Sequence, residues 1–102
     1  MNVQNLLRLN IPPSLEEDVV DLLLASSEIP GFQSYHTRGH GQVGAMTIAE
    51  QVAGRRERVQ FEIVLDASQL DSLLEKLRQS FPVPDIIYWV LPVAACGRLR
   101  EL

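Results

Sequence analysis

Arginines and histidines, the side chains best suited to bind anions or metals, gather around one glycine-rich stretch of this sequence. The six are His36, Arg38, His40, Arg55, Arg56 and Arg58. Between Arg38 and Arg58 four arginines outnumber two glutamates, a local charge of +2, whereas the net charge of the whole chain is −4. A guanidinium binds carboxylate and phosphate groups through paired hydrogen bonds. We therefore expect an anionic ligand or partner to meet this stretch of the chain.

Two interpretations of Arg55, Arg56 and Arg58 remain open from the sequence. The three arginines could dock on an acidic protein surface or hold an anion. They could equally form a solvated loop that keeps an edge strand from pairing with other chains.

A metal site at His36 and His40 is an alternative that one extended strand does not favour. Residues four apart in a strand stand about 13 Å from each other, whereas zinc lies about 2.0–2.1 Å from each imidazole nitrogen. One ion could join them only if the chain turned sharply at Gly39, or if several copies contributed histidines. Otherwise the two are polar residues at a strand end. Cys96 has no Cys-x-x-Cys partner and is expected to be a small, half-buried residue.

Catalysis and nucleic-acid binding find no support in the sequence. No serine or cysteine sits in a nucleophile motif, and no paired carboxylates lie at a loop tip, so we expect a protein that is not an enzyme. An acylphosphatase-like enzyme would need an arginine-bearing phosphate loop after the first strand, where residues 10–14 read NIPPS. The net negative charge argues against nucleic acid, and Phe61 alone does not make an RNA-stacking sheet.

The elements that must position these side chains follow from hydrophobic periodicity. Period-2 alternation predicts strands over residues 6–11 and 58–65. A weakly hydrophobic segment predicts a strand over residues 32–38, and an apolar run predicts one over residues 86–91, ended by Pro92. A capping box at Ser14 and Glu17 begins one helix, and Asp66 or Ser68 begins a second with leucines at helical spacing. The order β-α-β-β-α-β predicts an α+β, ferredoxin-like fold: a four-stranded antiparallel sheet with two helices on one face.

The long connection between the second and third strands, about residues 39–57, is expected to be the working part of a single domain spanning residues 1–102. Hairpin loops usually run 2–5 residues, and a much longer one is usually functional. Thr47 and Glu50 form another capping-box spacing, which predicts about two helical turns ending near Gly54. Apolar strand residues on both faces predict that the second face of the sheet meets another copy of the chain.

The location expected from the sequence is the cytoplasm. The first residues lack the basic and apolar regions of a signal peptide. No apolar run approaches the length of a membrane span, so we expect no direct insertion into a membrane. A single cysteine fits a reducing compartment.

Three segments resemble the PII signalling superfamily in order and spacing. Residues 31–42 (GFQSYHTRGHGQ) resemble its second strand and loop base, where Arg-Gly-Phe-Gly-Arg-Gln is typical. Residues 59–65 (VQFEIVL) resemble its third strand, and residues 87–93 (IYWVLPV) followed by residues 98–100 (RLR) resemble its last strand and tail. Residues 47–55 and 88–93 look closer still to a small subfamily of PII-like proteins that tend to be encoded beside heavy-metal efflux pumps.

The resemblance implies a homotrimer with ligand sites in the clefts between subunits and a mobile loop from each subunit that docks on a transporter or enzyme. The residues that match the nucleotide-wrapping loop base and the phosphate-contacting tail are Gly39, Gly41, Gln42, Arg98 and Arg100. The loop residues expected to contact a partner are Thr47, Glu50, Gln51, Arg55 and Arg56.

One departure bears on the cofactor. PII proteins carry a glycine-rich, lysine-bearing phosphate cradle between the second helix and the last strand, whereas residues 81–85 here read FPVPD. The cofactor therefore stays open between a nucleotide bound without that cradle and a metal. We expect a non-enzymatic regulatory protein that senses a small ligand and acts on a membrane transporter, with heavy-metal efflux as its process. The alternative is a direct divalent-metal-binding tolerance protein like the CutA proteins, with His36 or His40 as ligands.

Overall fold

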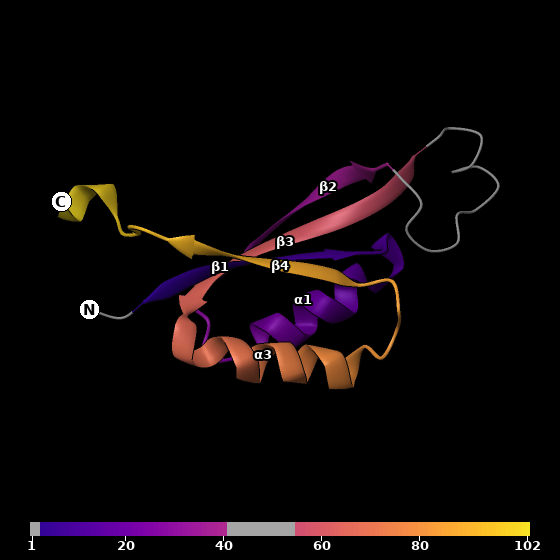
Figure 1. The fold of residues 1–102 in the computed structure, drawn as a ribbon, viewed down its shortest axis with the longest axis horizontal. Helices are drawn as coiled ribbons and strands as arrows, with labels where there is room; N and C mark the ends of the chain where they lie inside the picture. Colours follow the sequence, from indigo (N-terminus) through magenta and orange to yellow (C-terminus); the bar gives the residue numbers. More distant parts are fainter. Residues whose placement is uncertain (1–2, 41–54) are drawn as a thin grey trace.

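The computed structural model describes residues 3–40 and 55–102. Its elements follow the predicted β-α-β-β-α-β order (Figure 1). In chain order they are β1 (Gln4–Ile11), the 3-10 turn η1 (Pro13–Leu15), α1 (Glu16–Leu24), β2 (Gln33–Gly39), β3 (Arg56–Asp66), α3 (Ala67–Ser80), β4 (Ile87–Val93) and the 3-10 turn η2 (Leu99–Glu101).

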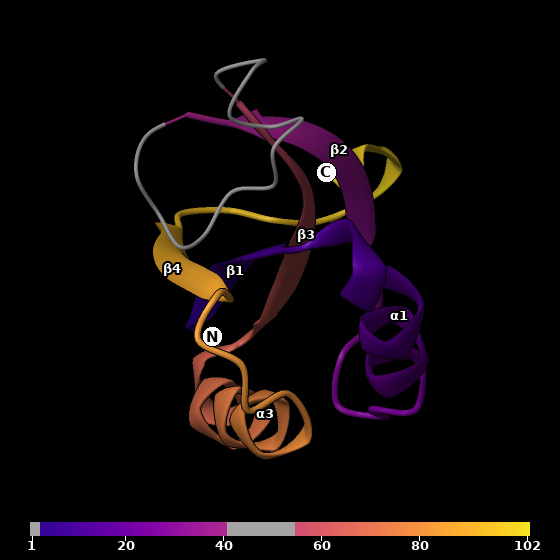
Figure 2. The same cartoon turned by 90° about the vertical axis from the view of Figure 1, so that its right-hand side faces the viewer.

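The four strands form one antiparallel sheet in the order β2-β3-β1-β4. Both α1 and α3 lie against one face of this sheet, as the view along the strands shows (Figure 2). The predicted ferredoxin-like fold is therefore confirmed. Since β3 and β1 are central, β2 and β4 are the edge strands.

The core lies between the sheet and the two helices and follows from period-2 alternation. Alternate residues of β1 and β3 point toward the helices and are buried, while leucines and a valine from α1 and α3 meet them at helical spacing. The fully buried members include Leu7, Ile11, Val19, Leu23, Val59, Phe61, Ile63, Leu65 and Leu73. Phe32, just before β2, packs on Phe61 with ring centroids 6.0 Å apart.

The strands around the long connection extend further than predicted. β3 begins at Arg56 rather than Arg58, and β2 continues to Gly39, so that Gly39 and Arg56 are paired across the two strands. The strands are longer because the backbone pairing between β2 and β3 continues beyond the apolar residues from which the strands were predicted. Arg56 and Glu57 are therefore strand residues and not part of a loop.

Two further boundaries were predicted wrongly. β4 continues through Pro92 to Val93, which an edge strand tolerates because one side of its backbone has no ladder to lose. The Ser14 capping box does not start α1, because a 3-10 turn comes first and Leu15 takes the N-cap position without a side-chain hydrogen bond. The N-cap of α3 is Asp66, one of the two residues predicted, but its side chain makes no capping hydrogen bond.

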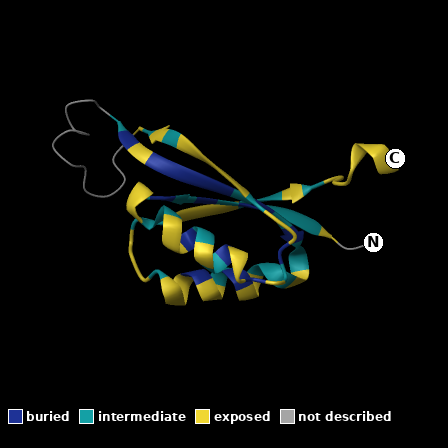
Figure 3. Ribbon diagram, turned by 180° about the vertical axis from the view of Figure 1, so that it is seen from behind, coloured by how far each residue is buried: buried dark blue, intermediate teal, exposed yellow. Residues whose placement is uncertain are grey.

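The face of the sheet away from the helices, here called the open face, carries both polar and apolar side chains. Its apolar members come chiefly from the β4 side of the sheet, where Trp89 pairs with Arg8 and Leu91 with Leu6. Figure 3 shows β3 buried along most of its length and β4 largely exposed. Tyr88 and Trp89 are 55% and 39% exposed within the chain, so neither belongs to its core. Within residues 3–40 and 55–102, neither α1 nor α3 has the length and apolar character needed to cross a membrane.

Candidate functional site

The Gly39–Arg56 pair stands at the end of β2 and the beginning of β3, where both strands turn toward the long connection (Figure 1). A pocket of about 190 Å³ opens beside this pair on the open face, and we call it the loop-base pocket. Among the described residues it is lined by Asn10, Gly39, His40, Arg56, Arg58, Ile87 and Trp89. Two guanidinium side chains thus stand opposite an apolar wall made by β4.

Arg58 is held by hydrogen bonds from two directions. Its Nε donates to Asn10 Oδ1 at 2.7 Å, and its Nη2 donates to the Asn10 carbonyl oxygen at 3.0 Å. On the other side its Nη1 donates to Asp85 Oδ2 at 3.0 Å and its Nη2 to the Asp85 carbonyl oxygen at 2.8 Å. The side chain is 4% exposed. A guanidinium fixed this way has little freedom left to lose when it binds a ligand.

Arg56 shares the same carboxylate. Its Nη1 donates to Asp85 Oδ1 at 3.2 Å and its Nη2 donates to Asp85 Oδ2, the paired geometry that arginine adopts with carboxylates. Asp85 lies in the turn between α3 and β4, so one residue of that connection binds both arginines of β3. The solvated-loop interpretation is therefore wrong for Arg56 and Arg58, which are both buried.

Because Gly39 has no side chain, the end of β2 can lie close to Arg56 and Arg58 of β3. A Cβ atom at this position would lie 3.3 Å from Arg58 Cγ and 3.7 Å from the Arg56 carbonyl oxygen. The first distance is tighter than ordinary van der Waals contact, and Arg58 is tied to Asn10 and Asp85. Any larger residue at position 39 would therefore displace the Arg58 side chain, which lines the pocket.

A chain of hydrogen bonds continues from the loop base across the open face. Asn10 Nδ2 donates to Gln60 Oε1 at 3.1 Å, Gln60 Nε2 donates to the Tyr35 hydroxyl at 2.9 Å, and that hydroxyl donates to Glu62 Oε1 at 2.8 Å. Glu62 also accepts from Gln33 and Arg8. These bonds link β2, β3 and β1 to the arginine pair through side chains alone.

The hydrogen bond between Tyr35 and Glu62 shifts the pKa of both side chains. The hydrogen bond from Tyr35, followed by that from Gln33, lowers the pKa of Glu62 below its usual 4.5 because each favours the carboxylate. The same bond to Glu62 raises the pKa of Tyr35 above 10.0, because ionising the phenol would remove the proton that it donates. Glu62 is therefore an anion and Tyr35 a neutral donor at neutral pH.

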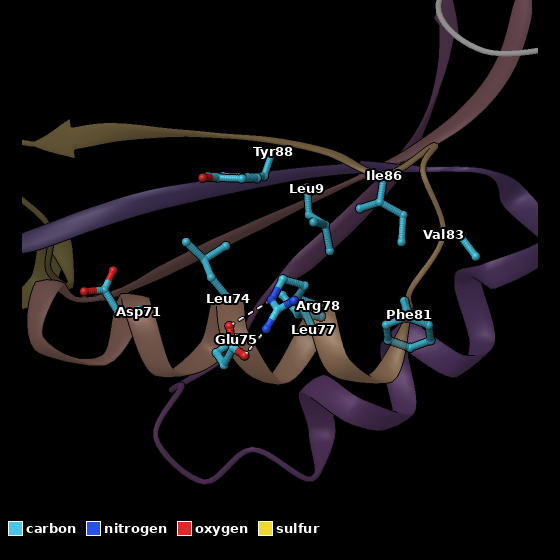
Figure 4. Close-up of a pocket in the computed structure, with 10 residues that line it drawn as sticks. All are labelled: Leu9, Asp71, Leu74, Glu75, Leu77, Arg78, Phe81, Val83, Ile86 and Tyr88. Atoms are coloured by element: carbon cyan, nitrogen blue, oxygen red, sulfur yellow. Dashed lines mark hydrogen bonds and ion pairs between the residues drawn. The ribbon is translucent and has the colours of Figure 1, made fainter.

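A second, larger pocket of about 470 Å³ lies between α3 and β4 on the helix side of the sheet (Figure 4). It is lined mainly by apolar side chains: Leu9, Leu74, Leu77, Phe81, Val83, Ile86 and Tyr88. At its rim Arg78 and Glu75 form an ion pair, and Asp71 lies toward the Tyr88 end (Figure 4). Among the described residues that line it, the one cation, Arg78, is 73% exposed and is outnumbered by two acids, Glu75 and Asp71, so this pocket suits an anion less well than the loop-base pocket.

The structure places the predicted site residues in three groups. Gly41, Gln42, Thr47, Glu50 and Gln51 lie outside the described residues. Gly39, His40 and Arg56 lie together at the loop-base pocket. Arg55 is not among the residues that line it; its side chain is half-buried, with Nε 3.7 Å from a carboxylate oxygen of Glu57. The third group, Arg98 and Arg100, is exposed at η2, at the end of the sheet opposite the loop base (Figure 1). One chain does not bring the tail arginines to the loop base.

The two histidines do not converge. His36 pairs with Val59 and so stands on the helix-facing side of the sheet, whereas His40 lines the loop-base pocket. Across residues 3–40 and 55–102, no three metal-ligating side chains stand close enough together to hold an ion.

Asn10 and Asp85 were not predicted as site residues from the sequence. Asp85 lies 27 positions after Arg58, and Asn10 lies 48 positions before it. Two features of the sequence could have pointed to these residues. A buried arginine needs hydrogen-bond acceptors within the protein. The connection before β4 also carries a carboxylate where the PII superfamily carries glycine and lysine. The periodicity of β3 alone could also have placed Arg58 and Gln60 on the open face.

The chain matches a family model described as a protein of unknown function (DUF3240) over residues 1–100. It is similar to the crystal structure of a DUF3240 family protein from Shewanella baltica OS155, with a TM-score of 0.80, 27% identity, and coverage of 97% of this chain and 99% of that one. No curated protein matches the chain.

Two less similar structures share the fold alone. The GlnK–ATP complex of B. subtilis has a TM-score of 0.71 at 17% identity over 97% of this chain and 91% of that one. A Bacillus cereus protein related to NIF3 has a TM-score of 0.69 at 17% identity, and the match covers 95% of this chain but 27% of that one. The resemblance to PII proteins is thus confirmed for the fold, and the residues matched by the family model show that the chain belongs to the DUF3240 family.

Proposed function

We propose that this chain is a non-enzymatic, PII-like regulatory protein that works as one domain over residues 1–102. In this proposal three copies form a trimer, a small anionic ligand binds at clefts between subunits, and the segment of residues 39–57 passes the signal to a membrane transporter. The observation that carries the proposal is the loop-base pocket. It sets two buried, fixed arginines beside Gly39 at the root of that segment.

The placement of charge supports a ligand of this class. Among the described residues lining the pocket, the charged ones are both arginines, and buried guanidiniums in fixed geometry favour carboxylate or phosphate groups. A ligand held there would touch both strands that lead into the 39–57 segment. Binding could then change how Thr47, Glu50, Gln51 and Arg55 meet a partner.

The open face supports the trimer. Trp89 and Ile87 stay exposed on it, and within residues 3–40 and 55–102 no strand pairs with the outer edge of β4. Exposed apolar side chains grouped on one sheet face are typical of an association surface. Association would also let Arg98 and Arg100 of one copy approach the loop base of a neighbouring copy, together with Gly41 and Gln42 of that copy.

We propose that this protein lies in the cytoplasm and that its partner is a heavy-metal efflux transporter. The support is the resemblance of residues 47–55 and 88–93 to PII-like proteins encoded beside such pumps. GlnK shares the fold and is described in complex with ATP, and ATP is therefore one of the ligands to test here.

The proposal is tested by mass measurement of the assembly followed by calorimetric titration with ATP, ADP, cyclic AMP, bicarbonate, Zn²⁺ and Cu²⁺. We expect a trimer whose anion binding falls at least tenfold in an Arg98→Gln, Arg100→Gln variant. Arg78→Gln, which removes an exposed arginine from α3, is the matched control and should bind as the wild type does. Binding of metal ions alone that is lost on changing His36 and His40 would contradict the proposal and favour direct metal binding.

A further inference from the structure

Asp85 already occupies the positions around Arg56 and Arg58 that an incoming oxyanion would take. Its two carboxylate oxygens accept from Nη1 and Nη2 of Arg56, and one of them also accepts from Nη1 of Arg58. A phosphate or sulfate binds a pair of arginines through the same forked arrangement of oxygens. The chain therefore supplies an anion of its own to its anion site.

The carboxylate of Asp85 is more exposed than the two guanidiniums that it binds. The side chain of Asp85 is 23% exposed, against 9% for Arg56 and 4% for Arg58. An oxyanion that approaches the guanidiniums meets the negative charge of Asp85 beside them, and the repulsion weakens its binding. A carboxylate in this place opposes binding both by occupying donors and by its charge.

Asp85 can leave without dismantling the sheet. It lies in a turn between α3 and β4 and takes no part in any strand pairing. Arg58 would keep its two bonds to Asn10, the 2.7 Å bond to the side chain and the 3.0 Å bond to the carbonyl oxygen. The pocket would thus keep a fixed guanidinium when Asp85 is changed or displaced.

We propose that Asp85 is a specificity-determining residue, an internal carboxylate that competes with small oxyanions for Arg56 and Arg58 at the loop-base pocket. The inference rests on the anion role proposed above for this pocket and adds the residue that limits it. The ligand class is a phosphate- or sulfate-sized oxyanion, because a volume of about 190 Å³ is below the roughly 300–1,000 Å³ of pockets that bury drug-sized ligands.

The test is a titration of inorganic phosphate, sulfate and pyrophosphate into the full chain, read by fluorescence. The chain has one tryptophan, Trp89, and it lines the pocket, so its emission reports binding at this site. We expect Asp85→Asn to bind phosphate at least tenfold more tightly than the wild type. Asp85→Glu, which keeps the negative charge, should bind as weakly as the wild type.

The controls separate local competition from a general change in charge. Asp71→Asn makes the same change in net charge on an exposed position of α3 and should leave phosphate affinity unchanged. Adding Arg58→Gln to Asp85→Asn should abolish the gain. If Asp85→Asn does not fold, Asp85→Ser keeps an acceptor for one guanidinium and carries the same expectation.

Three outcomes would overturn the inference. Equal phosphate affinity in the wild type and Asp85→Asn would make Asp85 a structural counter-ion only, while leaving the proposed anion site intact. A gain that Asp71→Asn reproduces would show a general charge effect. Absence of binding in both the wild type and Asp85→Asn would reject both the inference and the anion part of the proposed function.

Discussion

The guanidinium of Arg58, on β3, is joined to Asp85, in the turn between α3 and β4, through a 3.0 Å bond to its carboxylate and a 2.8 Å bond to its carbonyl oxygen. This contact ties the root of the 39–57 segment to the connection that leads into the edge strand β4. A change at either residue should therefore be felt at the loop base.

Replacing Arg58 should cost more stability than replacing an exposed arginine. Arg58→Met removes one of the two arginines that bind the Asp85 carboxylate and takes from Asn10 Oδ1 the hydrogen bond that Arg58 donates, which we expect to lower the free energy of unfolding by about 2–4 kcal/mol. Arg78→Met, on the exposed surface of α3, should leave it nearly unchanged because exposed ion pairs contribute little. Urea unfolding of the two variants beside the wild type measures the difference, and equal stabilities would contradict it.

Two glycines should respond differently to the same substitution. Gly39→Ala places a Cβ 3.3 Å from Arg58 Cγ, and because Arg58 is tied on two sides we expect a loss of about 1 kcal/mol. Gly31→Ala has no atom within 4 Å of its Cβ and should be neutral or slightly stabilising. Thermal unfolding compares them, and a neutral Gly39→Ala would show that Arg58 can shift.

Acid should remove a part of the stability that depends on Glu62. The pKa of Glu62 is lowered in the folded state, chiefly by the Tyr35 hydroxyl. Its contribution is therefore present above the unfolded value near 4.5 and is lost as the pH falls through the lower folded pKa. Glu62→Gln should flatten the acid side of the stability profile, below the unfolded value near 4.5.

The Tyr35 hydroxyl should matter to the same profile. Tyr35→Phe removes the bond to Glu62 and leaves the buried Gln60 amide without its acceptor, at a cost of about 0.5–1 kcal/mol near neutral pH given that Tyr35 is itself 40% exposed. The pKa of Glu62 should rise toward its usual value, which NMR titration of its side chain measures. An unchanged Glu62 pKa would show that Gln33 and Arg8 suffice to hold the carboxylate.

Neighbouring aromatic residues of β4 should separate the two faces in an association experiment. Trp89 lies on the open face, and Tyr88 lines the pocket on the helix side. If the trimer forms through the open face, Trp89→Glu should shift the mass measured by light scattering toward the monomer, while Tyr88→Glu should leave it unchanged. The reverse result would move the association surface to the α3–β4 side.

Much of the fold could be predicted because it depends on local periodicity. Alternation in residues 6–11 and 58–65 and leucine spacing after Asp66 identified the elements, and their order limited the topology to a ferredoxin-like sheet. The predicted strand boundaries were wrong where backbone pairing with a neighbouring strand, rather than local composition, determined how far the strand extends. The ladder with β2 extended β3 back to Arg56, and the edge position of β4 tolerated Pro92.

The sequence by itself determined the elements, their order and the presence of arginines around one glycine-rich stretch, because each of these depends on neighbours in the chain. Only the tertiary structure decided what Arg56 and Arg58 do. Their acceptors, Asn10 and Asp85, come from positions up to 48 residues away, and such contacts arise only once the antiparallel register is set. Burial then turned two apparent loop cations into fixed groups, because a buried guanidinium must find its acceptors within the protein.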